Sequence, residues 1–141
     1  MEKSINDYFN FELSPSQVSP LSLAYIGDAV YEMYIRSYIM HKANMPVSKL
    51  HKAATHYVSA KSQAFIIKKI VGDLSEEELS VYKRGRNAHS YTSAKNADIV
   101  DYRMATGLEA LIGFLYIKKD TKRLEEVISK CIDAVSLNNI I

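Results

Sequence analysis

Residues 23–30 read Leu-Ala-Tyr-Ile-Gly-Asp-Ala-Val and place one carboxylate inside an apolar run. From Leu21 to about His41, apolar side chains recur at helical spacing, and they are too dense for a helix that faces only solvent. Just before this segment, Ser19-Pro20 has the form of an N-cap followed by proline at the first helical position. The pattern therefore predicts a helix that packs in the core.

Two residues in the middle of this helix are unexpected there. Burial of the Asp28 carboxylate would be costly without a partner or a cation. Gly27 costs a helix about 1 kcal/mol relative to alanine, so we expect another backbone to approach closely at this position. Helix packing with a hydrogen-bonded Asp28 is the structural alternative to a functional site.

A second carboxylate has a similar setting later in the chain. Residues 102–113 read Tyr-Arg-Met-Ala-Thr-Gly-Leu-Glu-Ala-Leu-Ile-Gly, and Glu109 falls beside an apolar stripe, at the edge of the face that a helix should bury. Gly107 and Gly113 again leave the helix without side chains close to the carboxylate, as expected if another backbone packed close there. The structural alternative pairs Glu109 with Arg103 or with a lysine.

The remaining segments complete a chain of the all-α class, with no period-two strand pattern. We expect residues 1–18 to form an irregular arm and residues 19–141 to form a single domain. Beyond the first helix the patterns predict a short helix over 47–54 and a longer one over 57–71 that Gly72 closes. A further helix begins at the capping box Ser75–Glu78 and runs to about Arg84, where Gly85 breaks it. The last two helices are expected over 99–117 and over about 121–137, the latter capped by Asp120 or Thr121.

The composition fits one domain in a reducing compartment. With 141 residues, 48% of them hydrophobic, the chain can bury a core without disulfide bonds, and its single cysteine, Cys131, has no partner within the chain. No apolar stretch reaches the length of a membrane span, and the acidic start of the chain does not resemble a signal peptide. We therefore expect a soluble, cytoplasmic protein with no membrane partner.

The net charge of +2 is too small to identify a nucleic-acid-binding protein, but the basic residues are concentrated. No acidic residue occurs from Leu79 to Ala97, and this window contains the candidate RNA-binding residues Lys83, Arg84, Arg86, Asn87, Lys95 and Asn96. We expect an exposed loop over residues 85–97, with a helical turn inside it as an open alternative, and we expect this segment to contact nucleic-acid phosphates. The run has no ladder of aromatic residues of the single-strand-binding type, which favours a duplex. A solvated basic loop is the alternative.

Two carboxylates on two core helices are suitable ligands for Mg²⁺, which prefers oxygen and retains several waters for phosphate. If Asp28 and Glu109 meet, phosphodiester hydrolysis is the natural chemistry, because the metal ion generates hydroxide and neutralises charge on the scissile phosphate. No arrangement of serine, histidine and acid at a recognisable spacing competes. The sequence thus predicts Asp28 and Glu109 as catalytic residues and magnesium ligands.

Both motifs resemble those of the ribonuclease III family. Residues 23–30 are similar to the family's signature helix, with Asp28 at the position of its aspartate. Residues 109–113, Glu-Ala-Leu-Ile-Gly, look like its second motif, in which the glutamate is a magnesium ligand. Together with the basic run, the match points to the compact Mini-ribonuclease III branch, which lacks a separate double-stranded-RNA-binding domain. The resemblance covers nearly the whole chain after residue 18.

This resemblance implies an all-helical endonuclease domain that forms a homodimer with two magnesium-dependent sites, each cutting one strand of a double-stranded RNA. In that branch the substrate is the precursor of the large-subunit (23S) ribosomal RNA, trimmed at a stem formed by its ends. Tyr25 matches the signature phenylalanine that inserts into the partner subunit, so we expect Tyr25 at the dimer interface, with a place in the core as the alternative. A further hypothesis is that a ribosomal protein bound to the precursor presents the RNA.

The chain departs from the wider family at two positions. Ala24 and Thr106 stand where the family has a glutamate and an aspartate. The site would then rely on Asp28, Glu109, water and RNA phosphates, and we expect weak metal affinity without RNA. The missing carboxylates motivate a rival interpretation, a non-catalytic RNA-binding protein on the same fold. A helical protein-interaction module is a third, which leaves the basic residues without a role.

Overall fold

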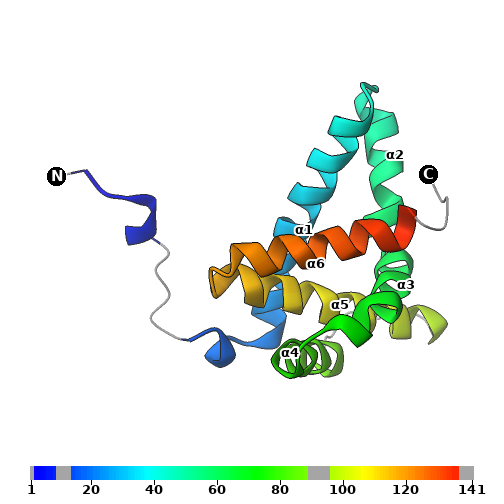
Figure 1. Cartoon of the computed structure of the whole chain (residues 1–141). Helices are drawn as coiled ribbons and strands as arrows, with labels where there is room; N and C mark the ends of the chain where they lie inside the picture. The colour runs from blue at the N-terminus through cyan, green and yellow to red at the C-terminus, as the bar shows by residue number, and fades with distance from the viewer. Residues whose placement is uncertain (1, 9–13, 89–95, 137–141) are drawn as a thin grey trace.

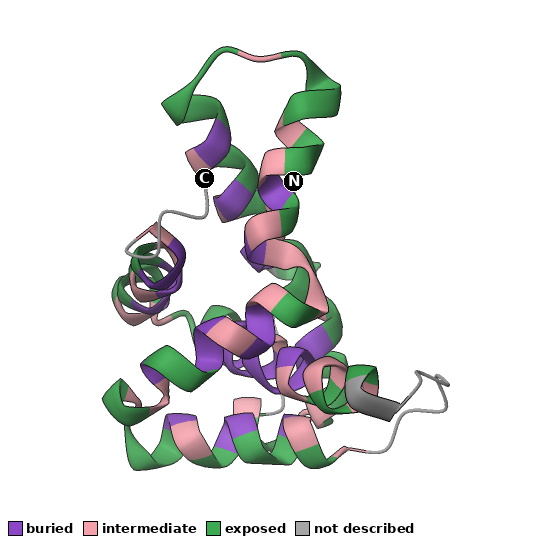
Figure 2. Cartoon of the chain, turned by 90° about the vertical axis from the view of Figure 1, so that its right-hand side faces the viewer, coloured by how far each residue is buried: buried purple, intermediate pink, exposed green. Residues whose placement is uncertain are grey.

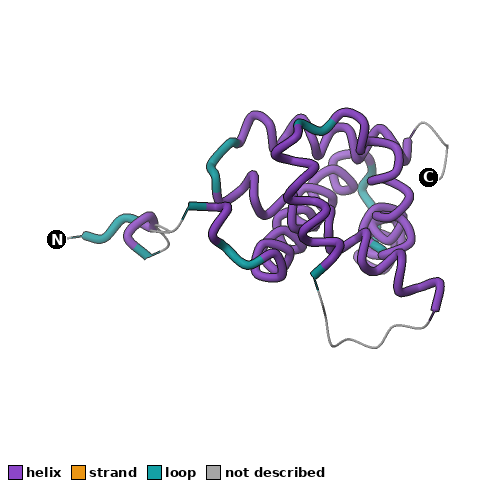
Figure 3. The backbone as a smooth tube through the Cα atoms, turned by 90° about the horizontal axis from the view of Figure 1, so that it is seen from below, coloured by secondary structure: helices purple, strands orange, loops and turns teal. Residues whose placement is uncertain are grey.

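The computed structural model of the chain describes residues 2–8, 14–88 and 96–136. Over these residues it contains six α-helices and no strand, which confirms the all-α class (Figure 3). The helices are α1 (Pro20–Lys42), α2 (Val47–Val58), α3 (Ala60–Ile70), α4 (Glu76–Asn87), α5 (Asn96–Ile117) and α6 (Thr121–Ser136), with short 3₁₀ turns η1 (Ile5–Asp7), η2 (Pro15–Gln17) and η3 (Val71–Asp73). None of the described helices combines the length and the apolar character that crossing a bilayer requires.

Helix α5 is the centre of the fold, because α1, α3, α4 and α6 all pack against it (Figure 1). Its side chains Leu108, Leu111 and Ile112 are fully buried. This position explains why the sequence of α5 is apolar on more than one face. Helices α1 and α2 run antiparallel, and their joined ends stand away from the other helices as a largely exposed hairpin (Figure 2).

The backbones of α1 and α5 touch each other at two glycines. A Cβ atom on Gly27 would overlap the main-chain carbonyl of Glu109 and would lie 2.7 Å from the amide nitrogen of Gly113. A Cβ atom on Gly113 would in turn overlap the carbonyl of Leu23. The expected close approach at Gly27 is therefore confirmed, and it brings the residues beside these glycines together.

A second pair of glycines lets α4 lie against α5. A Cβ atom on Gly85 would come within 2.6 Å of the Ala110 Cβ, and one on Gly107 would come within 2.7 Å of the Tyr82 carbonyl oxygen. The prediction that Gly85 breaks the helix is wrong, because α4 continues through it to Asn87. Gly85 is buried inside a helix crossing, where its missing side chain permits contact.

Other boundaries are confirmed or corrected by their hydrogen bonds. The capping box of α4 is present, with the Ser75 amide donating to Glu78 Oε1 at 2.9 Å and the Glu78 amide donating to Ser75 Oγ at 3.1 Å. Asp120 caps α6 by accepting from the Arg123 amide at 3.2 Å. The predicted short helix is too short, since α2 runs to Val58 and Ser59 caps α3.

Two predicted helix ends use a different mechanism from the one the sequence indicates. Pro20 begins α1, but the Ser19 side chain makes no capping hydrogen bond. Gly72 does not close α3 in a left-handed conformation, because α3 ends at Ile70 and continues into the 3₁₀ turn η3. The backbone conformation at position 72 therefore does not require a glycine.

A largely buried ion pair attaches the start of α4 to α6. The Arg123 guanidinium donates from Nε and Nη2 to the two carboxylate oxygens of Glu78, each at 2.8 Å, and from Nη2 to the Asp73 carbonyl at 3.0 Å. This guanidinium holds the pKa of the Glu78 carboxyl below its ordinary value. Such a two-point pair fixes geometry as well as charge.

We predict that Gly27→Ala destabilises the fold by more than the roughly 1–3 kcal/mol typical of an overpacked core, because the atoms in the way are backbone. Urea unfolding measures the change. Gly72→Ala is the matched control, since a Cβ atom there meets nothing within 4 Å, and we expect an effect within about 0.5 kcal/mol. Similar small effects for the two variants would contradict the direct contact of α1 with α5.

Candidate active site

The structure brings Asp28 of α1 and Glu109 of α5 together. Each residue lies next to the contact between Gly27 and the Glu109 backbone, so the two carboxyl groups are close enough to share a hydrogen bond when one is protonated. Burial, followed by repulsion from the Asp28 charge, raises the pKa of Glu109 from 4.5 to about 8. Two negative charges at this place therefore repel each other and favour a proton or a metal cation between them.

The two carboxylates differ in exposure, and one prediction is corrected. The sequence indicated a buried Asp28, but this residue is exposed on α1 because no neighbouring element covers it in the single chain. Glu109 is half-buried, as expected for the edge of a buried face. The site is therefore open on the Asp28 side and closed behind Glu109.

The side chain that contacts Glu109 from the protein interior is Gln63 of α3, which the sequence analysis missed. Gln63 Nε2 donates to Glu109 Oε2 at 3.4 Å. The alternative partner, Arg103, lies instead beside Tyr82 in a groove between α4 and α5. Among the described residues no cation lies within ion-pair distance of Glu109.

Other acidic residues near the pair are few. Glu32, one turn after Asp28, also raises the pKa of Glu109, but it is bound to Arg36 at 3.3 Å. Thr106 directs its hydroxyl to the Tyr102 carbonyl at 2.9 Å, within its own helix. Within residues 2–8, 14–88 and 96–136, no three histidine, cysteine or acidic side chains form a cluster that could hold a metal ion.

The donor set fits a magnesium ion with most of its coordination positions open. Mg²⁺ is commonly bound through one or two carboxylates, with waters and substrate phosphates completing its shell. Asp28 and Glu109 provide two carboxylates that repel each other and have no cation of their own among the described residues. A closed site built wholly from protein ligands, as for structural zinc, is not present among the described residues.

Four of the predicted RNA-binding residues lie on one helix. Lys83 and Arg84 are on α4 as expected, and Arg86 and Asn87, which were expected in a loop, also occupy its last turn because the helix does not end at Gly85. Lys95 lies outside the described residues. Asn96 begins α5, and its side chain is not among those described. The described part of the predicted basic segment is therefore helical and held rigidly against α5.

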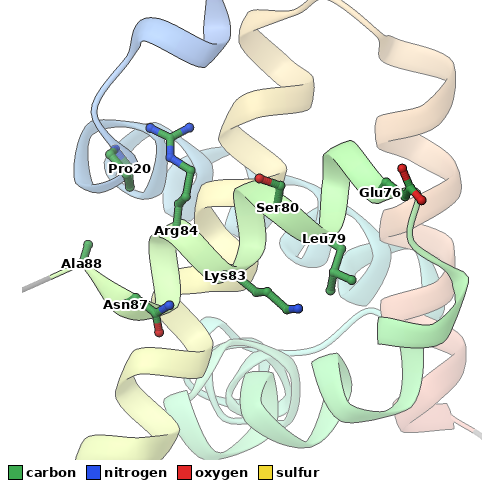
Figure 4. A pocket seen from close by; sticks show the side chains of 8 residues that line it. All are labelled: Pro20, Glu76, Leu79, Ser80, Lys83, Arg84, Asn87 and Ala88. Atoms are coloured by element: carbon green, nitrogen blue, oxygen red, sulfur yellow. The ribbon is translucent and has the colours of Figure 1, made fainter.

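Two open grooves flank α4 on either side. One, of about 710 Å³, lies between α4 and Pro20 at the start of α1, and Figure 4 shows Arg84 extending toward Pro20 while Lys83 leaves the helix in another direction. The other, of about 410 Å³, is lined by Arg86 and Arg103. Neither groove is lined by Asp28 or Glu109, so the cavities and the carboxylate pair are separate features of the surface.

A longer stretch of sequence without acidic residues was also missed. Residues 33–72 contain no acidic residue and seven lysines and arginines, all exposed: Arg36, Lys42, Lys49, Lys52, Lys61, Lys68 and Lys69. Four of the seven lie on the hairpin of α1 and α2. A count of acidic residues over a window of forty positions, rather than twenty, would have revealed it.

Tyr25 is the most exposed large apolar or aromatic side chain of α1, with 83% of its surface accessible. This exposure rules out the alternative that Tyr25 belongs to the core of the single chain. Leu21 and Met33 are exposed on the same helix. An apolar strip of this kind is typical of a surface that a partner covers.

Comparisons with known proteins identify the family of this domain. The profile of the Ribonuclease III domain family matches residues 21–120. A Mini-ribonuclease 3 from Enterococcus faecalis is 50% identical over 125 residues, which are 87% of this chain and 95% of that protein. One from Clostridium tetani is 53% identical over 118 residues, which are 83% of this chain and 78% of that protein. A crystal structure of a Fusobacterium nucleatum protein matches with a TM-score of 0.73 and 34% identity, over 83% of this chain and 93% of the other.

A helical domain with two carboxylates at the contact of its two central helices, matched by this profile over most of its length, belongs to the ribonuclease III family. The chain is therefore an endoribonuclease of the family that cuts double-stranded RNA. Within that family, its similarity to several curated proteins of the same kind places it in the Mini-ribonuclease III branch.

We predict that Glu109→Gln stabilises the metal-free protein in a pH-dependent way. The folded-state pKa of Glu109 is about 8 and its ordinary value is 4.5, so ionisation opposes folding of the wild type as the pH rises between these values. The gain in Tm of the variant should grow from about pH 5 to about pH 8 and then remain constant. Thermal unfolding in chelator measures it.

Glu76→Gln serves as the control for this pH series, because Glu76 is an exposed carboxylate at the start of α4, away from the pair. Its effect on Tm should not grow over the same range. A Glu109→Gln difference that is flat from pH 5 to pH 8 would show that the two carboxylates do not repel each other in the folded chain.

Proposed function

We propose that this enzyme cuts both strands of double-stranded RNA with magnesium bound by Asp28 and Glu109. The observation that carries the proposal is the pair of adjacent carboxyl groups with no cation of its own among the described residues, at an open position beside the helix contact. Asp28 is exposed and accessible to a substrate-bound ion, whereas Glu109 forms the half-buried floor of the site.

A bound magnesium ion would supply an activated water and neutralise charge on the scissile phosphate. The protein's own part is to fix the two carboxylates at one place on rigid helices and to keep Glu109 partly shielded from solvent. Because burial and the Asp28 charge keep the pKa of Glu109 high, a bound ion would displace a proton from the pair near neutral pH.

The exposed cations support RNA as the substrate. Lys83, Arg84, Arg86 and Asn87 on α4, together with Lys95 and Asn96, are proposed to bind the phosphate backbone, since each phosphate contact displaces a counterion. The joined ends of α1 and α2, which contain no acidic residue after Glu32, add further exposed cations. Two rigid cationic elements favour a duplex recognised by its shape over a flexible single strand.

A homodimer is part of the proposal, with Tyr25 at its interface. The support is the exposure of Tyr25 together with Leu21 and Met33 along one helix. An isologous contact through α1 would place one carboxylate pair in each subunit, so that a dimer would carry two sites, one for each strand.

For the biological substrate we propose the precursor of 23S ribosomal RNA, trimmed at the stem formed by its ends, in the cytoplasm. The support is membership of the Mini-ribonuclease III branch. We also propose that a ribosomal protein presents this RNA, since the exposed cations of α4 belong to the segment that the family profile covers, residues 21–120, and a presenting protein would add to the contacts they make. Faster cleavage of precursor carrying such a protein than of naked precursor would support this step.

We predict that Asp28→Asn abolishes magnesium-dependent cleavage of a long duplex RNA and leaves duplex binding intact, because it removes one ligand charge without changing the shape of the side chain. Gel-based cleavage with and without chelator, beside a single-stranded control, measures the loss. Asp133→Asn changes an exposed carboxylate on α6 and should cut at the wild-type rate. A wild type that binds duplex but never cuts it would instead favour a non-catalytic RNA-binding protein.

We predict that the double variant Lys83→Ala/Arg84→Ala weakens duplex binding and lowers the slope of log K against log salt by about 2, close to one unit for each lost phosphate contact. Fluorescence anisotropy at several salt concentrations measures it. The charge-matched control is Lys118→Ala/Lys130→Ala, whose ammonium groups are bound to Glu77 and Asp73. Equal changes in slope for the two double variants would argue against α4 as the RNA-binding element.

A further inference from the structure

Gln63 is a buried polar residue whose hydrogen-bonding needs the fold does not meet. Three polar or charged side chains are buried among the described residues: Gln63, Glu78 and Thr106. Glu78 is satisfied by Arg123 and Ser75, and Thr106 donates to a carbonyl of its own helix. Gln63 is 1% exposed, and its Oε1 has no hydrogen-bond partner.

The orientation of the Gln63 amide is fixed by its surroundings. Its Nε2 donates to the Val58 carbonyl at 2.9 Å and to Glu109 Oε2 at 3.4 Å. Both partners are acceptors, so a rotated amide would place its oxygen against two other oxygens. The amide donor therefore faces Glu109, and the unpaired oxygen is a consequence of that orientation.

The junction of α2 and α3 holds Gln63 in this place. Ser59 accepts from the Ser62 amide at 3.2 Å and donates to Ser62 Oγ at 2.8 Å, and Ser62 Oγ donates to the Thr55 carbonyl at 3.2 Å. These bonds fix the first turn of α3, in which Gln63 lies. A third helix thereby reaches the carboxylate pair that α1 and α5 form.

A buried acceptor without a partner costs about 1–3 kcal/mol, and an apolar side chain of similar size would avoid this cost. The stability of the fold therefore does not explain a glutamine at this position. Carboxylates that bind metal ions are in turn commonly held by hydrogen bonds from neighbouring side chains, which orient them.

We propose that Gln63 is a positioning residue, which holds the Glu109 carboxylate through Oε2 so that the carboxylate keeps one orientation toward Asp28 and a bound divalent cation. This inference rests on the proposed function, since it assigns Gln63 to the metal site of the same reaction. Gln63 does not itself touch the RNA, because it is enclosed in the protein.

The test replaces the amide with an apolar side chain of similar length, Gln63→Met. We expect metal binding and turnover to fall about 10–100-fold, the usual effect of losing a residue that orients a metal ligand. Mn²⁺ binding to the RNA-free protein, followed by electron paramagnetic resonance, is measured beside kcat and KM for duplex RNA. The KM for RNA should not change, because the RNA-binding cations are on other surfaces.

Thermal unfolding in chelator separates this role from a structural one. The Tm of Gln63→Met should stay within about 3 °C of the wild type, since removal of the unpaired oxygen offsets the lost bond to Val58. Gln17→Met, which changes an exposed glutamine that caps the 3₁₀ turn η2, should leave metal binding and turnover unchanged.

Two results would overturn the inference. One is a folded Gln63→Met with wild-type Mn²⁺ affinity and kcat, in an assay where the wild type cuts and Asp28→Asn does not; this leaves the proposed function intact. The other is a loss of turnover matched by a large fall in Tm, which would make Gln63 structural. A wild type that neither binds Mn²⁺ nor cuts duplex would overturn the proposed function and this inference together.

Discussion

The rest of the structure depends on the direct contact between the backbones of α1 and α5. Gly27 lies against the carbonyl of Glu109, and Gly113 lies against the carbonyl of Leu23, so neither helix can move outward without leaving a gap in the centre of the fold. Because Asp28 follows Gly27 and Glu109 is itself part of the contact, the same packing that closes the core also sets the two carboxylates side by side. Fold and site therefore share one constraint.

Much of this arrangement is visible in the sequence, because helical periodicity and glycine beside a carboxylate are local signals. Gly27, Gly107 and Gly113 were correctly interpreted as points of close approach, whereas Gly85 was interpreted as a helix break. The glycine itself does not distinguish a helix break from a close helix contact. A close contact requires small residues on the opposing helix, and only the packed structure shows that α5 places Ala110 and Gly107 opposite Gly85. Arg86 and Asn87 were accordingly assigned to a loop, although they lie on α4.

Two features of the site were beyond the sequence for a different reason. Asp28 lies in an apolar run, but the exposure of a single helical position depends on which neighbours cover it, and none does in the single chain. Gln63 lies 46 residues from Glu109, and its neighbours Ile66, Ile67 and Ile70 mark α3 as an ordinary core helix. In the sequence, the local signal for a special role of Gln63 is a polar residue on a core helix. Its hydrogen-bond partner, Glu109, is brought to it only by the tertiary fold.

The exposed cations and the carboxylate pair lie at different places in the structure. Exposed cations lie on α3, on α4 and on the hairpin of α1 and α2, and among the described residues no cation forms an ion pair with Asp28 or Glu109. A fold selected only for stability would have placed a lysine or arginine beside this pair, or a hydrophobic residue at Gln63. The helix contact instead holds two like charges together at a cost, which is typical of a functional site. Under the proposed function, a divalent cation would relieve that repulsion, and the exposed cations elsewhere on the surface would attract the phosphates of the substrate.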